Sequence, residues 1–242
     1  IDKAAEMRYG EVDKKRGGAK GMFEQMEQRK LAAQKLRQMW QGNLVIMISV
    51  IFMVVVVVIM LMSAMTNPLT MYVGGGLEFT LVMTLLSTLA MTVGMIIYLV
   101  GLYGLRNVQP EYRTAFQCWL VSFVLNLISS LAGEGSLIAS ILDLATTVLN
   151  LVVLWLVLTA TNRLMEEISR DDVIQRGRTV WILNLISTVC AVVVALIPIE
   201  VATGAALALT ISLAALAVSV VADFWYLGYL GRAATALTEN MW

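Results

Sequence analysis

Six apolar stretches separated by short polar segments form the main pattern of this chain. A helix of about 20 residues crosses the hydrocarbon core of a bilayer, and each stretch reaches roughly that length. The predicted spans cover about 44–65, 77–105, 114–132, 137–161, 180–197 and 203–230. Because a helix satisfies its own backbone hydrogen bonds in lipid, the pattern predicts an all-α, polytopic integral membrane protein with six transmembrane helices.

Positive charge lies on one side of this arrangement. Of the 17 Lys and Arg residues, ten lie within residues 1–43, two within 106–113, four within 163–178, and the last is Arg232. The segments on the other side carry none. Basic loops stay on the cytoplasmic side during insertion, so we expect both termini in the cytoplasm and the protein in the plasma (inner) membrane.

The predicted organisation has three parts. Residues 1–43 form a cytoplasmic basic segment that is helical from about residue 22, residues 44–232 form the transmembrane domain, and residues 233–242 form a cytoplasmic tail. Because the chain begins with Ile1 and not with methionine, we expect further sequence upstream. The first long apolar run starts only at Leu44, which does not fit a secretory signal peptide.

Composition narrows the function classes. Hydrophobic residues make up 59% of the chain and charged residues 14%, far from the values of a soluble domain. Histidine is absent, which excludes sites that need imidazole as a general base or a metal ligand. Cys118 and Cys190 lie within or beside apolar runs, so we expect no structural disulfide. We therefore expect no enzyme activity, no cofactor and no metal site.

An internal repeat indicates three consecutive helical hairpins. The sequence Leu-Asn-Leu-Ile-Ser occurs at 125–129 and again at 183–187, in the third and fifth spans. Each even-numbered span also ends with an aromatic residue that is followed seven or eight positions later by arginine. The alternative is that aromatic belts and positive loops produce such a coincidence in any membrane protein.

Polar residues recur at helical spacing within the spans. On the fourth span, Ser136, Ser140, Asp143, Thr147 and Asn150 are separated by steps of three and four, so they form one stripe. The candidate intramembrane polar or transport residues are Asp143, Asp223, Asn126, Asn150 and Asn184.

The two aspartates give these stripes more than one interpretation. Small and polar residues are typical of surfaces where membrane helices pack closely. An ionised carboxylate in hydrocarbon, however, costs at least about 2.5 to 3.5 kcal/mol, and no Lys or Arg lies within a span to offset Asp143 or Asp223. Protonation, or hydration through a cleft, would remove that cost.

The segment before the first span is basic and helix-forming. Its basic residues are Lys14, Lys15, Arg16, Lys20, Arg29, Lys30, Lys35 and Arg37. We expect them to contact the bilayer, specifically the anionic lipids of the inner leaflet, either as a surface helix or as one that continues into the first span. A short basic helix without interleaved aromatic residues does not favour nucleic acid, so no nucleic-acid partner is expected.

Two functions are consistent with these features. The first is a non-catalytic structural, assembly or interaction component of a membrane complex, in contact with further copies of itself or with another membrane protein. The alternative is a small ion or solute channel or transporter whose polar interior reaches Asp143 or Asp223. The first predicts a tightly packed interior, whereas the second predicts a water-accessible cavity at one aspartate.

Overall fold

The protein is all-helical in the computed structural model, which describes residues 3–66, 76–132, 136–195 and 202–239. The helices are α1 (Lys3–Thr66), α3 (Gly76–Gly104), α4 (Pro110–Ala132), α5 (Leu137–Glu166), α6 (Asp171–Ala195) and α7 (Ala202–Glu239). Each contains a segment long and apolar enough to cross a membrane: Met26–Val56, Glu78–Gly104, Pro110–Ala132, Ile138–Glu166, Asp171–Val193 and Ala214–Glu239. The predicted all-α fold with six candidate transmembrane helices is confirmed, and it indicates a multi-pass membrane protein.

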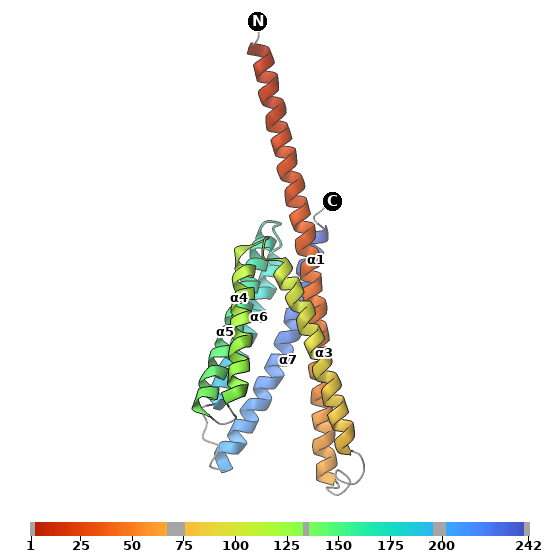
Figure 1. Ribbon diagram of the computed structural model, residues 1–242, viewed down its shortest axis with the longest axis vertical. Helices are drawn as coiled ribbons and strands as arrows, with labels where there is room; N and C mark the ends of the chain where they lie inside the picture. Colours follow the sequence, from red (N-terminus) through yellow and green to blue (C-terminus); the bar gives the residue numbers. More distant parts are fainter. Residues whose placement is uncertain (1–2, 67–75, 133–135, 196–201, 240–242) are drawn as a thin grey trace.

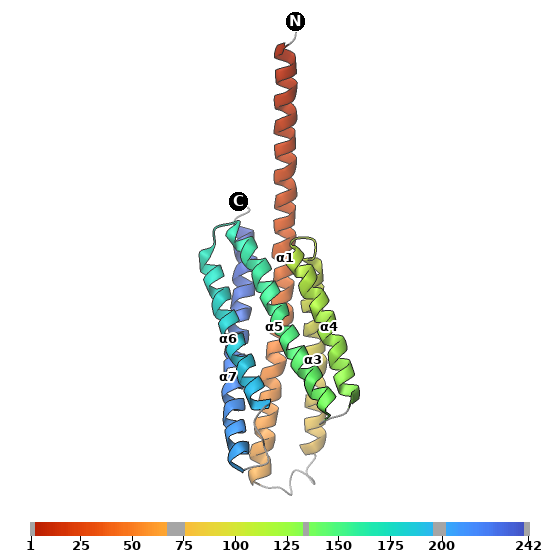
Figure 2. The same ribbon diagram turned by 90° about the vertical axis from the view of Figure 1, so that its left-hand side faces the viewer.

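Helices that are consecutive in the chain lie side by side (Figures 1 and 2). The most extensive contacts join α1 to α3, α4 to α5 and α6 to α7, and α7 also packs against α1. Toward the lower end of Figure 1, α1 and α3 diverge from α4, α5 and α6. Helix α7 starts beside α6 at that end and reaches α1 at the other, so it connects the two parts of the bundle.

Fully buried side chains gather at the upper end of Figure 1, where the turns at Leu105–Gln109 and Glu167–Arg170 lie near the end of α7. We call this the basic end, because each of the two turns contains an arginine. The largest are Leu36, Met39, Leu102, Leu105, Tyr112, Val157, Met165, Val173, Val180, Tyr229, Leu230 and Leu237. Toward the opposite end apolar side chains are exposed, up to 86% for Leu131 and 62% for Ile138. Such a surface is typical of helices that face lipid rather than water.

Helix α1 extends beyond the range that the sequence predicted. It begins at Lys3, not near residue 22. Once a helix is nucleated, each further residue adds one hydrogen bond, so the helix-forming segment after Met22 can propagate toward the N-terminus. This part projects past the other helices in both views.

The end of the predicted basic segment also packs inside the bundle. Ala32, Leu36 and Met39 are completely buried, in one cluster with Leu102 of α3 and Leu237 of α7. Of the two alternatives for this segment, a surface helix or a continuous rise into the first span, the structure has the continuous helix.

Two glycines allow α1 and α3 to approach closely. A Cβ atom added to Gly42 would lie 2.4 Å from the backbone nitrogen of Tyr98 and 2.6 Å from the carbonyl oxygen of Gly94. A Cβ on Gly94 would lie 2.8 Å from the carbonyl oxygen of Gly42. Only hydrogen fits at this crossing, which is how small residues bring membrane helices together.

The charged segment between the fourth and fifth spans is mostly helical. Helix α5 continues to Glu166 and α6 begins at Asp171, so only four residues connect them. Ser169 adopts a left-handed conformation with φ of 56°, and the Arg170 N–H donates to the carbonyl of Met165. A left-handed residue with this hydrogen bond ends a helix and satisfies its last carbonyl groups, so no longer loop is needed.

Candidate functional site

The polar side chains of α4 and α5 form a row of direct contacts. Ser122 donates to Asn150 Oδ1 at 2.8 Å, and seven residues further along α4 Ser129 donates to Asp143 Oδ1 at 2.6 Å. Seven residues is two helical turns, so both bonds lie on the same face of this antiparallel pair. Nearer the basic end, the Tyr112 and Thr161 hydroxyls share a third bond of 2.7 Å.

A cavity of about 360 Å³ lies among the six helices that the structure describes. We call it the central cavity. Its lining comprises Asn43 and Ile46 of α1, Met95 and Tyr98 of α3, Trp119 of α4, Thr147, Asn150, Leu151 and Leu154 of α5, Asn184 and Thr188 of α6, and Asp223 and Tyr226 of α7. Of these described residues, Asp223 alone carries a charged group, and it is half-buried.

The structure brings together three of the five predicted intramembrane residues. Asn150, Asn184 and Asp223 all line the central cavity. The Asn184 amide donates to the carbonyl of Val180 on its own helix at 3.0 Å, which leaves its side-chain oxygen as an acceptor. The cavity therefore offers amide groups and one carboxyl, a set of oxygen and nitrogen atoms that suits a small polar guest.

The other two predicted residues do not line this cavity. Asp143 and Asn126 are exposed on α5 and α4. Asp143 accepts a hydrogen bond from Ser129, so its partner is a neutral hydroxyl and not a cation. The two aspartates thus occupy different environments, and only Asp223 reaches the cavity.

Tyr98, Tyr226 and Asn43 are among the lining residues that the sequence did not predict as site residues. The Tyr98 and Tyr226 hydroxyls share a hydrogen bond of 2.8 Å that joins α3 to α7. The Nδ2 atom of Asn43 is buried and has no hydrogen-bond partner among the described residues. An amide nitrogen has two N–H donors. Leaving a buried polar group without a hydrogen-bond partner costs about 1 to 3 kcal/mol of free energy. Asn43 stands immediately before the first predicted span, which is why its position in the sequence gave no signal.

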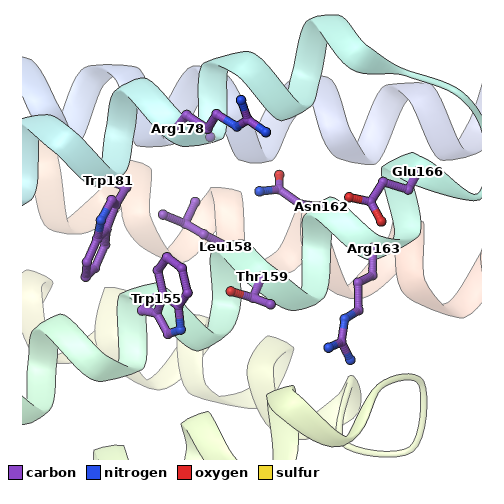
Figure 3. A pocket seen from close by; sticks show the side chains of 9 residues that line it. Trp155, Leu158, Thr159, Asn162, Arg163, Glu166, Arg178 and Trp181 are labelled. Carbon is purple, nitrogen blue, oxygen red and sulfur yellow. The ribbon is translucent and has the colours of Figure 1, made fainter.

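A second pocket, of about 270 Å³, lies between α5 and α6 at the basic end (Figure 3). The rings of Trp155 and Trp181 contact each other here in a tilted arrangement, with centroids 5.0 Å apart. Arg178 and Arg163 border the pocket together with Glu166, and Arg163 forms an ion pair with Glu111 of α4. The acidic groups offset the arginines, so this pocket has little net charge.

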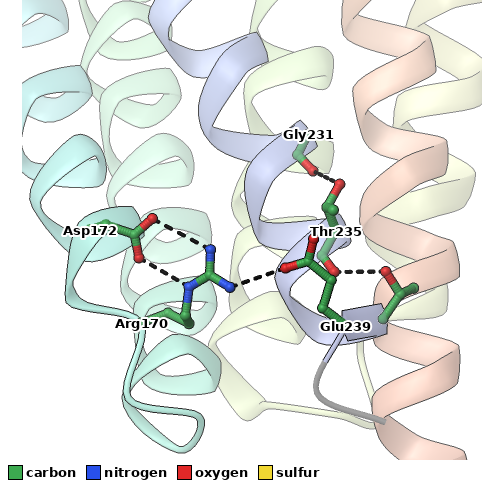
Figure 4. Close-up of polar contacts among 6 residues, drawn as sticks. Arg170, Asp172, Gly231, Thr235 and Glu239 are labelled. Carbon is green, nitrogen blue, oxygen red and sulfur yellow. Dashed lines mark hydrogen bonds and ion pairs between the residues drawn. The ribbon is translucent and has the colours of Figure 1, made fainter. Parts of the chain in front are cut away.

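Ion pairs at the basic end connect the turn between α5 and α6 to the start of α6 and to the end of α7. Arg170 bonds Asp172 at 3.1 Å and Glu239, at the end of α7, at 3.2 Å (Figure 4). These two hydrogen-bonded carboxylates raise the pKa of Arg170 above its ordinary value. Tyr229 of α7 donates to Asn162 Oδ1 at 2.8 Å, which adds a buried contact between α7 and α5.

The predicted membrane-surface residues are described in part. The side chains of Lys14, Lys15, Arg16 and Lys20 lie outside the described residues. Lys30 and Arg37 are exposed, and Arg29 is half-buried. Lys35 donates to Gln38 at 3.1 Å, and its aliphatic stem lies over Gly104.

Comparison of the chain with models of protein families, with curated proteins and with solved structures finds no match. The function must therefore be argued from the geometry of the chain itself.

Proposed function

We propose that this protein is a membrane channel or transporter that admits a small cation or a small cationic solute to the central cavity. One observation carries the proposal: a cavity of about 360 Å³ reaches the half-buried carboxyl of Asp223 and touches all six helices. Within the described part of the chain, no Lys or Arg lines it to neutralise that group. Because an isolated carboxylate in hydrocarbon is costly, a bound cation, a proton or water is needed beside it.

The surroundings of Asp223 support a polar guest. Asn150, Asn184 and Thr188 add amide and hydroxyl groups from two other helices, and Asn43 brings an unpaired donor. A guest that carries both a positive group and a hydrogen-bond acceptor would satisfy Asp223 and Asn43 together. Intramembrane ionisable residues that face a cavity are typical of ion and solute pathways.

Flux through reconstituted protein tests this proposal. Vesicles that contain the protein are loaded with a dye sensitive to protons or to a monovalent cation, and uptake is compared between the unaltered chain and Asp223→Asn. We expect the variant to lose most of the flux, because it keeps the shape of the side chain and removes its charge. Asp143→Asn is the matched control, since Asp143 lies outside the cavity. Equal flux in all three proteins would exclude this function.

A second candidate is the non-catalytic assembly or interaction component. The exposed Asp143 and Asn126 favour it, because polar groups on the outer surface of membrane helices are expensive unless another helix covers them. A second copy of this chain or another membrane protein would do so. Mass measurement in detergent separates the candidates: Asp143→Leu should dissociate such a complex, whereas a chain that is monomeric before and after the change does not form one through this surface.

The pairing of consecutive helices and the positions of the Lys and Arg residues support one transmembrane topology. We infer three consecutive hairpins, α1–α3, α4–α5 and α6–α7, with both termini in the cytoplasm and the basic N-terminal helix near anionic inner-leaflet lipid in the plasma (inner) membrane. A cysteine placed at Ser169 tests the orientation after Cys118 and Cys190 are replaced by alanine. An impermeant thiol reagent should label it only when the cytoplasmic side is accessible, and labelling from outside intact cells would reverse the assignment.

A further inference from the structure

We propose that the groove between α1 and α7 at the basic end binds the headgroup of an anionic phospholipid. This groove holds about 650 Å³. Its lining includes Lys30, Arg37 and Trp40 of α1 and Gly231 and Thr238 of α7. The proposal concerns a different site from the central cavity and does not depend on transport.

The charge of the groove selects an anion. Lys30 and Arg37 both line it and are exposed, and among the residues that the structure describes no acidic side chain lines it. Neither forms an ion pair with any other residue of the described ranges. Two unpaired cations seven residues apart lie two turns apart on one face of α1, so both can reach the same headgroup. Arginine is well suited to phosphate, because its planar group can donate two parallel hydrogen bonds.

The carboxylate of Glu239, at the end of α7, is directed away from the groove. Glu239 follows Thr238 at the end of α7, yet it bonds Arg170 at 3.2 Å. In Figure 4 its side chain extends toward Arg170 and away from α1. The ion pair therefore keeps a negative group out of the groove. The pocket between α5 and α6 differs on this point, because Glu166 borders it beside the arginines.

The position of the groove points to lipid and not to a free anion. Trp40 lies half-buried at its floor, and its indole nitrogen would be 3.2 Å from a Cβ on Gly231. Tryptophan is enriched at the level of lipid headgroups. Two turns further along α1, Ile48, Ile51 and Phe52 are exposed apolar side chains, against which acyl chains can lie. A headgroup held by Lys30 and Arg37 thus has an apolar surface further along the same helix, on the side toward the bilayer.

Quenching of Trp40 by brominated lipid tests the site directly. The protein is reconstituted into phosphatidylcholine vesicles with increasing amounts of brominated phosphatidylglycerol or brominated phosphatidylcholine. The signal of Trp40 is the difference between the unaltered protein and Trp40→Phe, because the chain has 6 tryptophans. We expect the anionic lipid to quench Trp40 at a lower mole fraction than the zwitterionic lipid does.

The variant Lys30→Gln/Arg37→Gln should raise the half-quenching fraction of the anionic lipid by about 25-fold, the product of about fivefold for each basic residue near an anionic surface. Both side chains are exposed, so the change should leave the bundle folded. The matched control is Arg106→Gln/Arg113→Gln, which removes the same charge at the same end and should shift that fraction less than twofold.

Three results would overturn the proposal. They are equal quenching by the two lipids, an unchanged value in Lys30→Gln/Arg37→Gln, and an equal loss in the control. Inorganic phosphate at constant ionic strength identifies the occupant. If it displaces the anionic lipid, the groove holds a free anion and the assignment to lipid is wrong.

Discussion

The crossing of α1 and α3 gives the sharpest test of the packing. Gly42→Ala would place a Cβ atom 2.4 Å, 2.6 Å and 2.8 Å from three backbone atoms of α3. Carbon atoms in proteins normally approach other heavy atoms to about 3.5 to 4.0 Å, so the helices must separate by roughly 1 Å. Backbone atoms cannot rotate away as the tip of a side chain can.

The cost follows from the same geometry. Overpacking of this kind typically costs about 1 to 3 kcal/mol. Alanine gains up to about 1 kcal/mol over glycine in helix propensity, which opposes the loss. The control Gly228→Ala carries the same gain, but its added Cβ would meet only the Arg176 guanidinium at 3.1 Å, the end of a flexible side chain. Because the Gly42 Cβ would meet backbone atoms, we expect a cost in the upper part of that range, so that Gly42→Ala is about 2 to 3 kcal/mol less stable than Gly228→Ala.

The assay is thermal unfolding in one detergent, followed by loss of the monodisperse species. At about 2 to 4 °C per kcal/mol for a chain of this size, the two variants should differ by about 4 to 12 °C. Gly94→Ala should behave like Gly42→Ala, since its Cβ would lie 2.8 Å from the Gly42 carbonyl. If Gly42→Ala melts within about 2 °C of the control, the close approach of α1 and α3 is wrong.

Three further outcomes are expected. Leu36→Ala should lower the free energy of unfolding by about 2 to 5 kcal/mol because this side chain is fully buried, whereas Ile59→Ala, at a position 57% exposed, should change it by less than about 1 kcal/mol; both are measured by the same melts. Tyr226→Phe should cost about 0.6 kcal/mol through its bond to Tyr98, and a double-mutant cycle with Tyr98→Phe should recover that coupling. Arg170→Gln should leave the melting temperature unchanged at high salt, because its ion pairs are exposed and screened; a large loss there would show a role that the geometry does not explain.

Apolar length was sufficient to predict the helices but not how they face one another. Six apolar runs gave six described helices, since a helix satisfies the backbone hydrogen bonds of its own segment in lipid. Helical spacing placed Asp143, Thr147 and Asn150 on one stripe of α5, yet only Thr147 and Asn150 line the central cavity. A stripe fixes one face of one helix. It does not say at what depth the neighbouring helices diverge, and here α1 and α3 separate from α5 toward the end where Asp143 lies.

The buried part of α1 was missed for a different reason. Lys30, Lys35 and Arg37 alternate with Ala32, Leu36 and Met39, so the sequence predicted a basic helix on the membrane surface or one continuous with the first span, and not a face buried against other helices. Its apolar face packs on α3 and α7, while Lys35 lays its stem over Gly104. Long basic side chains can cover apolar surface with their stems and still expose their charge to water. A hydropathy averaged along the sequence therefore does not reveal the buried face.

The concentration of buried side chains at one end has a mechanical consequence. The helices pack tightly at the basic end and diverge beyond it, so a small tilt at the packed end displaces the far ends of α1 and α3 relative to those of α4, α5 and α6. Each diverging part can be treated as a rigid arm. An arm of 20 residues is about 30 Å long, so a tilt of about 5° at the packed end moves its far tip by roughly 2 to 3 Å. Such a displacement changes the width between the tips by the diameter of a water molecule, while the packed end itself scarcely moves.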